Sequence, residues 1–386
     1  MKAPDAYPLS GRPGSLADRF SHQVVGDNTL SSGEKLVVAL SGGVDSTVLL
    51  HLLRFTSGLP PFSLVAAHFD HEMRPESGED RRWVVGLCRA WGIPLQVGIA
   101  PFPLNSEEEA REARYRYLHQ AKDETDAKWL LTGHHADDQA ETVLFRVIRG
   151  TGLRGLAGIP TARAPGVYRP LLPFSRSELS DYAQERGIPF LEDRTNNDLT
   201  YPRNFLRHRV LPQIQEGPAP GVRESLLRLA RLARENEDAW ESLFPRLLDG
   251  VLVEENGDIL IVRSALLAYH PAVQTRLLRG IFARSGIELE EAGTRAAMEF
   301  TRTGASGGAL SLPGGVRLVR EFDEFRLREV SPPGESGGFS SMRLVPVLAD
   351  SRWVGQASGR NGALTNRLAV MPPLNYQWPV WNFLSF

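Results

Sequence analysis

Short apolar runs alternate with amphipathic stretches along the first half of the chain. Residues 36–40, 63–69, 95–100 and 129–133 are apolar, rich in β-formers and of the length of strands. The stretches between and after them repeat apolar residues at helical spacing, over residues 47–53, 83–91, 106–122 and 137–149. Strands that alternate with helices predict right-handed crossovers and a parallel sheet covered on both faces. We therefore predict an α/β fold for this half.

The pattern changes in the second half. A Ser-x-x-Glu capping box at residues 175–178 predicts a helix that Gly187 ends. The Pro- and Gly-rich residues 217–221 form the best domain boundary, and a helical pattern, a strand, a second helix and a hairpin follow them. We accordingly predict an N-terminal extension (1–32), a parallel-sheet domain (33–216), a smaller helical and α+β domain (217–330), and a linker and tail to which we assign no fold (331–386).

The composition is that of a globular protein, with 42% hydrophobic and 23% charged residues. The net charge of −2 means that any nucleic-acid surface must be a local patch. Cys88 is the only cysteine, which excludes internal disulfides and cysteine-based metal clusters. Residues 1–32 lack the apolar core of a signal peptide, and no apolar run has the length of a membrane span. These features predict a cytoplasmic protein with no membrane partner, and they leave the oligomeric state, a homodimer included, open.

Residues 41–46, Ser-Gly-Gly-Val-Asp-Ser, follow the first predicted strand and lead into a helix. A helix N-terminus with bare backbone N–H groups is an anion site, and the two glycines allow a phosphate to approach the backbone. The two serines offer hydroxyl donors, and Asp45 offers an oxygen ligand for a divalent cation. The loop lacks the lysine of a Walker A sequence and the pattern G-x-G-x-x-G. The alternative interpretation is a turn that binds no ligand.

A second polar cluster, residues 133–142, follows the fourth predicted strand with two histidines, two aspartates and a glutamate. Asp138 and Glu141 are three residues apart at a helix start, so both carboxylates share a face. They could hold a substrate ammonium, or complete a magnesium shell with Asp45. The simpler interpretation makes Asp137 or Asp138 the N-cap and Glu141 an acid favoured by the helix dipole.

Other polar residues have competing interpretations. His68 and His71 flank Asp70 after the second strand, where a hydrogen-bonded loop is commoner than a zinc site. Arg111 lies in a glutamate-rich helix start, where surface ion pairs are the default. The arginines of residues 222–248 form either a solvated face or an RNA-binding patch. Because ligands bind at the carboxyl ends of parallel strands, we expect residues 41–46, 68–74 and 133–141 to line one crevice.

The motifs resemble a known family. Ser-Gly-Gly-x-Asp-Ser at 41–46 matches the signature of the PP-loop ATP pyrophosphatases. In order and spacing, the chain further resembles the tRNA(Ile)-lysidine synthetases at residues 41–46, 68–71 with Arg74, 110–115, 134–142, 149–156, 169–172 and 192–207. The resemblance is close over residues 36–212 and weaker to residue 327. The tail departs from the longer members, of which only residues 344–348 resemble the last domain.

The resemblance implies a PP-loop fold of the adenine nucleotide alpha hydrolase type and an ATP-dependent ligase that uses Mg²⁺. ATP would adenylate the carbonyl oxygen of the wobble cytidine in the CAU anticodon of an isoleucine tRNA, and L-lysine would displace AMP to form lysidine. Asp45, Asp138 and Glu141 would be catalytic, with Asp45 also holding Mg²⁺. The implied ligand contacts are ATP at Ser41, Gly42, Gly43, Val44, Asp45, Ser46 and His68, lysine at Asp138, Glu141 and Arg111, and tRNA at Arg203, Asn204 and Arg207.

Other interpretations stay open on the sequence. A tRNA thiolase is the nearest PP-loop alternative, but such enzymes commonly use paired cysteines, and this chain has one. Amide-forming relatives such as GMP or NAD synthetase lack the pattern of residues 134–142. A non-catalytic module that binds ATP is an alternative of another class, against which the carboxylate cluster argues.

Overall fold

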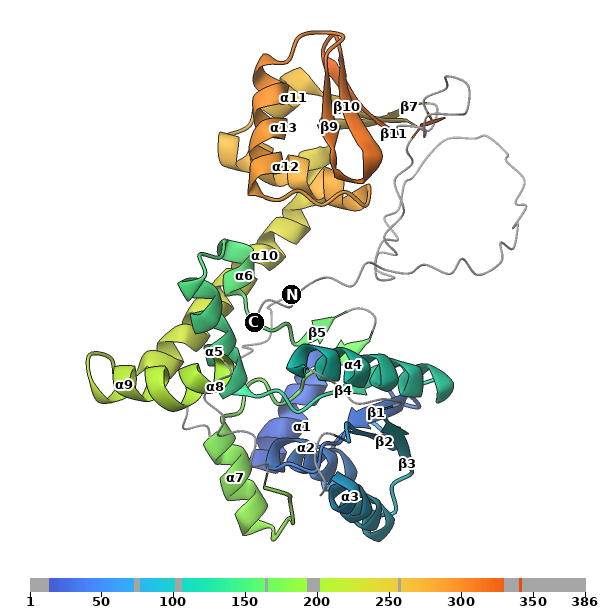
Figure 1. The fold of residues 1–386 in the computed structure, drawn as a ribbon, viewed down its shortest axis with the longest axis vertical. Helices are drawn as coiled ribbons and strands as arrows, with labels where there is room; N and C mark the ends of the chain where they lie inside the picture. The colour runs from blue at the N-terminus through green and yellow to red at the C-terminus, as the bar shows by residue number, and fades with distance from the viewer. Residues whose placement is uncertain are drawn as a thin grey trace. The chain divides into compact units, whose positions relative to one another are not determined.

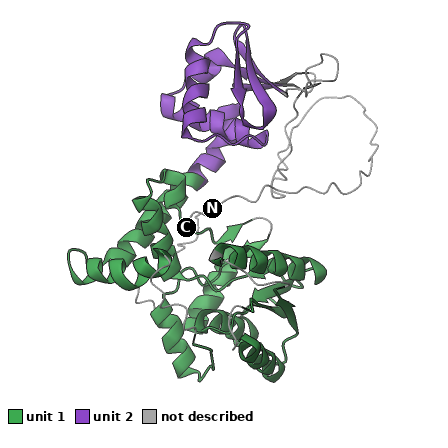
Figure 2. Ribbon diagram, in the orientation of Figure 1, with its two compact units in different colours: residues 1–237, 377–386 green, residues 238–376 purple. Residues whose placement is uncertain are grey.

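The computed structural model describes residues 14–72, 77–100, 106–163, 166–192, 202–255, 258–329 and 340–341 (Figure 1). The chain divides into two compact units between Glu237 and Asp238 (Figure 2). Arg74 and residues 193–200 lie outside the described residues, as does nearly all of the predicted linker and tail. No helix in the described ranges combines the length and the apolar character needed to cross a membrane.

The first unit contains a six-stranded sheet in the order β3-β2-β1-β4-β6-β5. The pairs from β3 to β6 are parallel, and only the edge strand β5 runs antiparallel to its neighbour. The strands are β1 (Lys35–Ala39), β2 (Ser63–Asp70), β3 (Leu95–Ile99), β4 (Trp129–Leu131), β5 (Ala162–Arg163) and β6 (Val167–Tyr168). The predicted parallel α/β sheet is therefore confirmed, and β5 and β6 are additional to the four predicted strands.

Helices join and cover these strands. They are α1 (Leu16–Asp27), α2 (Val44–Phe55), α3 (Ser77–Trp91), α4 (Glu107–Glu124), α5 (Ala136–Ile148), α6 (Leu153–Leu156), α7 (Arg176–Glu185), α8 (Pro202–Phe205), a π-helical turn (Leu206–Val210), α9 (Leu211–Glu216) and α10 (Val222–Leu248). Alternate residues of β1 enter different clusters: Leu36 and Val38 pack with α2, whereas Val37 packs with α4. The central strand is therefore buried on both faces, as its unbroken apolar run predicts.

Helix α1 lies within the predicted N-terminal extension and is part of the first unit's core. Phe20 and Val24 are fully buried in the cluster that includes Leu36 and Leu49. Ser15 caps the helix in a reciprocal capping box with Asp18. Each large apolar side chain buried in this way contributes about 1.5–3 kcal/mol relative to exposure. The helix therefore stabilises the sheet, although the sequence was interpreted as polar at this end.

The second unit is an antiparallel sheet with helices, as predicted for a smaller α+β domain. Its strand order is β7-β8-β11-β10-β9, with β12 paired to β11. The elements are β7 (Leu252–Glu255), β8 (Asp258–Val262), α11 (Arg263–Leu267), α12 (Pro271–Arg284), α13 (Glu291–Thr303), β9 (Ala309–Leu312), a 3₁₀ turn (Pro313–Gly315), β10 (Val316–Glu321), β11 (Glu324–Glu329) and β12 (Ser340–Ser341). Ile281 and Phe282 of α12 pack against Leu318 and Phe325 of the sheet.

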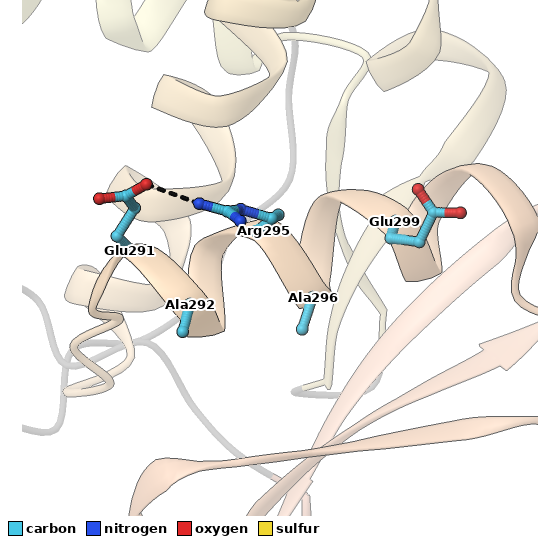
Figure 3. A pocket seen from close by; sticks show the side chains of 5 residues that line it. All are labelled: Glu291, Ala292, Arg295, Ala296 and Glu299. Carbon is cyan, nitrogen blue, oxygen red and sulfur yellow. Dashed lines mark hydrogen bonds and ion pairs between the residues drawn. The ribbon is translucent and has the colours of Figure 1, made fainter.

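One exposed face of α13 forms a shallow depression, shown in Figure 3. It is lined by Glu291, Ala292, Arg295, Ala296 and Glu299, and the Glu291 carboxylate accepts a 2.7 Å hydrogen bond from Arg295. The pair is four residues apart on a solvated helix, where such contacts contribute a few tenths of a kcal/mol (~0.3–0.5). None of the predicted site residues lies in this depression.

The division between the units falls inside α10 rather than at the Pro- and Gly-rich break. Residues 217–221 form the turn between α9 and α10, and the first part of α10 packs on α5 and α9 through Leu226 and Ala230. The apolar stripe at the start of α10 therefore belongs to the first unit.

Candidate active site

The loop between β1 and α2 has the geometry of a phosphate cradle. Ser46 Oγ accepts a hydrogen bond from the Ser41 backbone N–H at 3.2 Å and lies 3.0 Å from Ser41 Oγ. Gly42 has a φ of 93°, which requires glycine, and a Cβ there would lie 2.7 Å from Leu191 Cδ1 and force that side chain to move. Gly43 is the N-cap of α2 and provides no side-chain cap. The first N–H groups of α2 are therefore not capped by a side chain, which is the condition for binding an anion.

His68 and Asp70 at the end of β2 are held by the protein. His68 is buried, and its Nδ1–H donates a 2.8 Å hydrogen bond to the Leu40 carbonyl just before the cradle. Asp70 accepts a 2.9 Å hydrogen bond from the Glu72 backbone N–H and lies 3.5 Å from Arg81 Nη1. These are the contacts of a hydrogen-bonded loop. Across the residues that the structure describes, no group of three or more His, Cys, Asp or Glu side chains has the arrangement of a metal site.

The N-cap of α5 is His135, so the simpler interpretation, in which Asp137 or Asp138 caps this helix, is wrong. His135 Nδ1 accepts from the Asp138 backbone N–H at 3.4 Å, and Asp138 Oδ2 accepts from the His135 N–H at 3.0 Å. Asp137 instead accepts a 2.8 Å hydrogen bond from the Arg176 backbone N–H at the start of α7 and pairs with Arg223. Histidine is not among the usual N-cap residues, so the sequence alone favoured the aspartates.

His135 joins the cradle to the carboxylates of α5. Its Nε2 lies 3.6 Å from Asp45 Oδ2 and 3.5 Å from Asp138 Oδ2. Burial opposes a charge on this ring, but Asp138, Asp45 and Asp137 outweigh it and raise the pKa of His135. Gly133 permits the approach, because a Cβ there would lie 3.1 Å from the Asp45 carbonyl carbon and from the Ser46 nitrogen. The loops after β1 and β4 therefore meet, as expected.

Arg203 and Arg207 close an ion-pair cluster with the two carboxylates. Arg203 lies 3.0 Å from Asp138 Oδ1 and 3.0 Å from Glu141 Oε2. Arg207 lies 3.2 Å from Asp138 Oδ1 and 2.6 Å from Glu141 Oε1. Burial raises the pKa of Asp138, but His135 and Arg203 outweigh it and hold that pKa well below its ordinary value. The residues assigned to tRNA and those assigned to lysine therefore contact one another.

Asp45 is the residue that fits a divalent cation. Its Oδ1 is buried and has no hydrogen-bond partner among the described residues. Mg²⁺ is typically held by one or two carboxylates together with water and substrate phosphates, so one free carboxylate oxygen beside a phosphate cradle suffices. Asp138 and Glu141, in contrast, are occupied by arginines.

His134 and Arg169 lie at the ends of neighbouring strands. His134 Nδ1 is 2.8 Å from Thr132 Oγ1, and burial lowers the pKa of His134 to about 3, so the ring is neutral at physiological pH. Arg169 follows β6, is only 7% exposed, and was not assigned a role from the sequence, where it lay within a longer motif. Arg111 lies on α4 with its guanidinium 5.3 Å from the Tyr115 ring. No hydrogen bond or ion pair joins Arg111 to the α5 carboxylates in the described part of the chain.

Comparisons with known proteins identify relatives whose sequences match the part of the chain that carries this site. A family model described as the PP-loop domain matches residues 16–214. The tRNA(Ile)-lysidine synthase of Thermotoga sp. (strain RQ2) is 42% identical over 207 residues, which cover 52% of this chain and 50% of that protein. The tRNA(Ile)-lysidine synthase of Thermosynechococcus vestitus is 33% identical over 75% of this chain and 85% of its own length. The chain spans about half the length of the first of these relatives and of two others.

Among solved structures, a U34-tRNA thiolase from Methanococcus maripaludis is 20% identical, with a TM-score of 0.48 over 56% of this chain and 78% of the other. The PP-loop match covers the unit that carries the cradle and the carboxylates, and the relatives extend it toward the second unit. The chain therefore belongs to the PP-loop proteins and, within them, to the tRNA(Ile)-lysidine synthase family.

Proposed function

We propose that the protein is an ATP-dependent ligase that joins L-lysine to the wobble cytidine of the CAU anticodon of an isoleucine tRNA. The observation that carries the proposal is the continuous set of contacts from Asp45 in the cradle, through His135, to Asp138. These contacts join the loop of residues 41–46, to which we assign the phosphates, to the carboxylates of α5, to which we assign an ammonium group. A ligase that activates one substrate with ATP and attacks it with an amine needs both.

In the first step the carbonyl oxygen of cytidine attacks the α-phosphate of ATP, and pyrophosphate leaves. The backbone N–H groups of residues 41–46 would hold the phosphates, supported by the uncapped start of α2. Asp45 would hold Mg²⁺, which supplies charge neutralisation at the leaving pyrophosphate. His68 is held against Leu40, so its place in the ATP site is to fix the strand end before the cradle.

In the second step the neutral ε-amine of lysine forms a bond to the ring carbon, the carbon–oxygen bond breaks, and AMP leaves with the former carbonyl oxygen. The new carbon–nitrogen bond leaves a proton in excess on the amine, which passes to solvent. Asp138 and Glu141 would hold an ammonium group of lysine. The depressed pKa of Asp138 makes it a weak base, so we assign it to binding and orientation rather than to proton removal.

Arg203 and Arg207 have two roles in this proposal. Without RNA they neutralise Asp138 and Glu141. With tRNA bound, their guanidinium groups would turn to the backbone phosphates, with Asn204 beside them on α8. An anticodon loop already exposes its bases, so the wobble cytidine reaches the site at little unpairing cost. The compartment that we propose is the cytoplasm, where tRNA is found, and a homodimer stays a prediction.

The test is incubation of the protein with ATP, radiolabelled lysine and isoleucine tRNA transcripts that differ only at the wobble base. We expect label in the transcript with cytidine at that position and none in the transcript with uridine, with release of both AMP and pyrophosphate. Pyrophosphate release without any transfer of label would contradict the proposal, as would label transfer that ignores the wobble base.

A further inference from the structure

Arg169 is a buried cation without a carboxylate partner. It is 7% exposed, and its Nη1 donates a 2.9 Å hydrogen bond to the Pro160 carbonyl. Its Nε is buried with no hydrogen-bond partner among the described residues. A second contact, to the Tyr115 hydroxyl, is also to a neutral group. A buried guanidinium is costly to keep without a negative partner, so this arrangement indicates a ligand that carries the missing charge.

The topology brings this cation to the carboxylate cluster. Strands β4 and β6 are paired in parallel with Leu131 opposite Tyr168, and the Thr132 N–H donates a 3.1 Å hydrogen bond to the Tyr168 carbonyl. Arg169 therefore leaves β6 beside the segment of β4 that leads into His134 and His135. The charges that act on the ring of His134 are Asp138, Arg169, Arg203 and Arg111.

Two of the arginines that act on His134 have no ion-pair partner among the described residues. Arg203 is neutralised by Asp138 and Glu141, whereas neither Arg169 nor Arg111 forms an ion pair with any described residue. Arg111 stacks on Tyr115, whose hydroxyl contacts Arg169, so the two free guanidiniums flank one aromatic side chain. The carboxylates of α5 are paired with Arg203 and Arg207, whereas Arg169 after β6 has no negative partner, so the site matches a zwitterion once those two arginines turn away from the carboxylates.

We propose that Arg169, assisted by Arg111, binds the α-carboxylate of the amino-acid substrate and makes the enzyme select lysine over simple amines. This inference rests on the proposed function and deepens it. The phosphates of ATP are the less suitable ligand, because β6 is two strands from β1, about 10 Å away, and the cradle follows β1. An RNA phosphate is also less suitable, because 93% of Arg169 is covered by protein and a carboxylate on a flexible stem reaches such a group more easily.

The experiment compares lysine with cadaverine, which has the same amines but no carboxylate. Transfer to the tRNA is measured as kcat/KM for each amine, in the full chain and in Arg169→Gln. We expect the unaltered enzyme to prefer lysine by about 100-fold, as for a buried charge-assisted contact, and Arg169→Gln to reduce that preference to about threefold or less. Arg169→Lys keeps the positive charge but lacks the planar guanidinium that can donate two hydrogen bonds to one carboxylate. It should retain about a tenfold preference for lysine over cadaverine.

Arg111→Gln is the second variant, in case Arg169→Gln does not fold, because Arg111 is exposed on α4 and its substitution should leave the fold intact. We expect it to lower the preference for lysine over cadaverine severalfold. Arg116→Gln, an exposed arginine on the same helix, is the matched control and should leave the preference unchanged. The proposal is overturned if folded Arg169→Gln and Arg111→Gln keep the full preference for lysine, or if they weaken the use of both amines equally, as loss of an RNA contact would. Absence of lysine transfer by the unaltered enzyme would instead overturn the proposed function.

Discussion

Single polar atoms account for much of the site's chemistry. Asp45 shows this most clearly, because its Oδ2 faces His135 while its Oδ1 is buried without a partner. A buried carboxylate oxygen without a hydrogen-bond partner either destabilises the fold or serves as a ligand for a cation. Its position at the start of α2, beside uncapped backbone N–H groups, favours the second interpretation.

We therefore predict that Asp45→Asn lowers tRNA-dependent pyrophosphate release by about 10²–10³-fold, the size found when one electrostatic contact to the reacting phosphates is lost. Asparagine preserves the shape, so the thermal unfolding midpoint should change little. Pyrophosphate release is measured at saturating Mg²⁺, with Asp123→Asn at an exposed position of α4 as the control. Turnover at the original rate would remove Asp45 from the mechanism.

His135 makes stability depend on pH. Its pKa is raised above the ordinary 6.5 in the folded protein, because Asp138, Asp45 and Asp137 outweigh burial. The charged ring, whose Nδ1 then carries a proton and no longer accepts from the Asp138 N–H, stabilises the fold through the neighbouring carboxylates fully below pH 6.5. This contribution is lost as the pH rises through the folded-state pKa. His135→Asn keeps an N-cap but removes the charge.

We predict that the free energy of unfolding falls in His135→Asn most strongly below pH 6.5, and that the difference from the unaltered protein shrinks as the pH rises through the raised folded-state pKa of His135. Urea unfolding of both proteins, from below pH 6.5 upward, measures this difference in the free energy of unfolding. A difference that stays constant with pH would show that only the cap, and not the charge, matters.

At the scale of elements, the π-helical turn Leu206–Val210 carries Arg207, one of the two arginines that pair with the carboxylates of α5. It continues α8 and leads into α9, and it directs Arg207 to Glu141 at 2.6 Å. Wide turns of this kind are frequent at functional sites. The neighbouring Arg209 on the same turn is exposed, so the two arginines form a natural comparison.

We predict that Arg207→Met destabilises the fold by about 2–3 kcal/mol, because it leaves buried Glu141 with one arginine instead of two. Arg209→Met should change stability by less than about 0.5 kcal/mol. Equilibrium urea unfolding of both variants at neutral pH provides the measurement. Equal effects of the two substitutions would mean that the cluster adds no net stability.

The sequence predicted elements where the periodicity was strong and missed them where the signal was short. The four strands with long apolar runs, and α4, α5, α7 and α10, were all predicted. Strand β6 has two residues, too few for alternation to be recognised, yet it positions Arg169. Helix α1 did carry a signal, because Leu16, Phe20 and Val24 recur four residues apart behind the capping serine at 15.

The site was predictable in its residue types and less so in its contacts. The phosphate cradle and the carboxylates of α5 are recognisable from local spacing. The pairing of Arg203 with Asp138 joins residues 65 positions apart, and no local pattern encodes it. Arg169 could be noticed only as an arginine directly after an apolar strand end, a signal that many surface arginines share.

For the molecule as a whole, the cluster of Asp138, Glu141, Arg203 and Arg207 would link the two substrates that the proposed function assigns to it. Two carboxylates and two guanidiniums are balanced, so a lysine ammonium can join them only if an arginine leaves. RNA phosphates offer the arginines another partner of the same chemistry. If tRNA takes up the arginines, the carboxylates become available to lysine, and because linkage is reciprocal, lysine must in turn tighten tRNA binding.

We predict that saturating tRNA increases the affinity for lysine by about tenfold or more, within the usual range of coupling between sites. Equilibrium dialysis of labelled lysine, with and without tRNA and in the absence of ATP, measures the coupling before any chemistry. In Arg203→Gln the competing guanidinium is gone, so lysine should bind more tightly without tRNA and gain less from adding it. Because a purely structural role for Arg203 would weaken lysine binding in both conditions, an equal loss with and without tRNA would contradict the coupling and leave the arginines as fixed supports of the carboxylates.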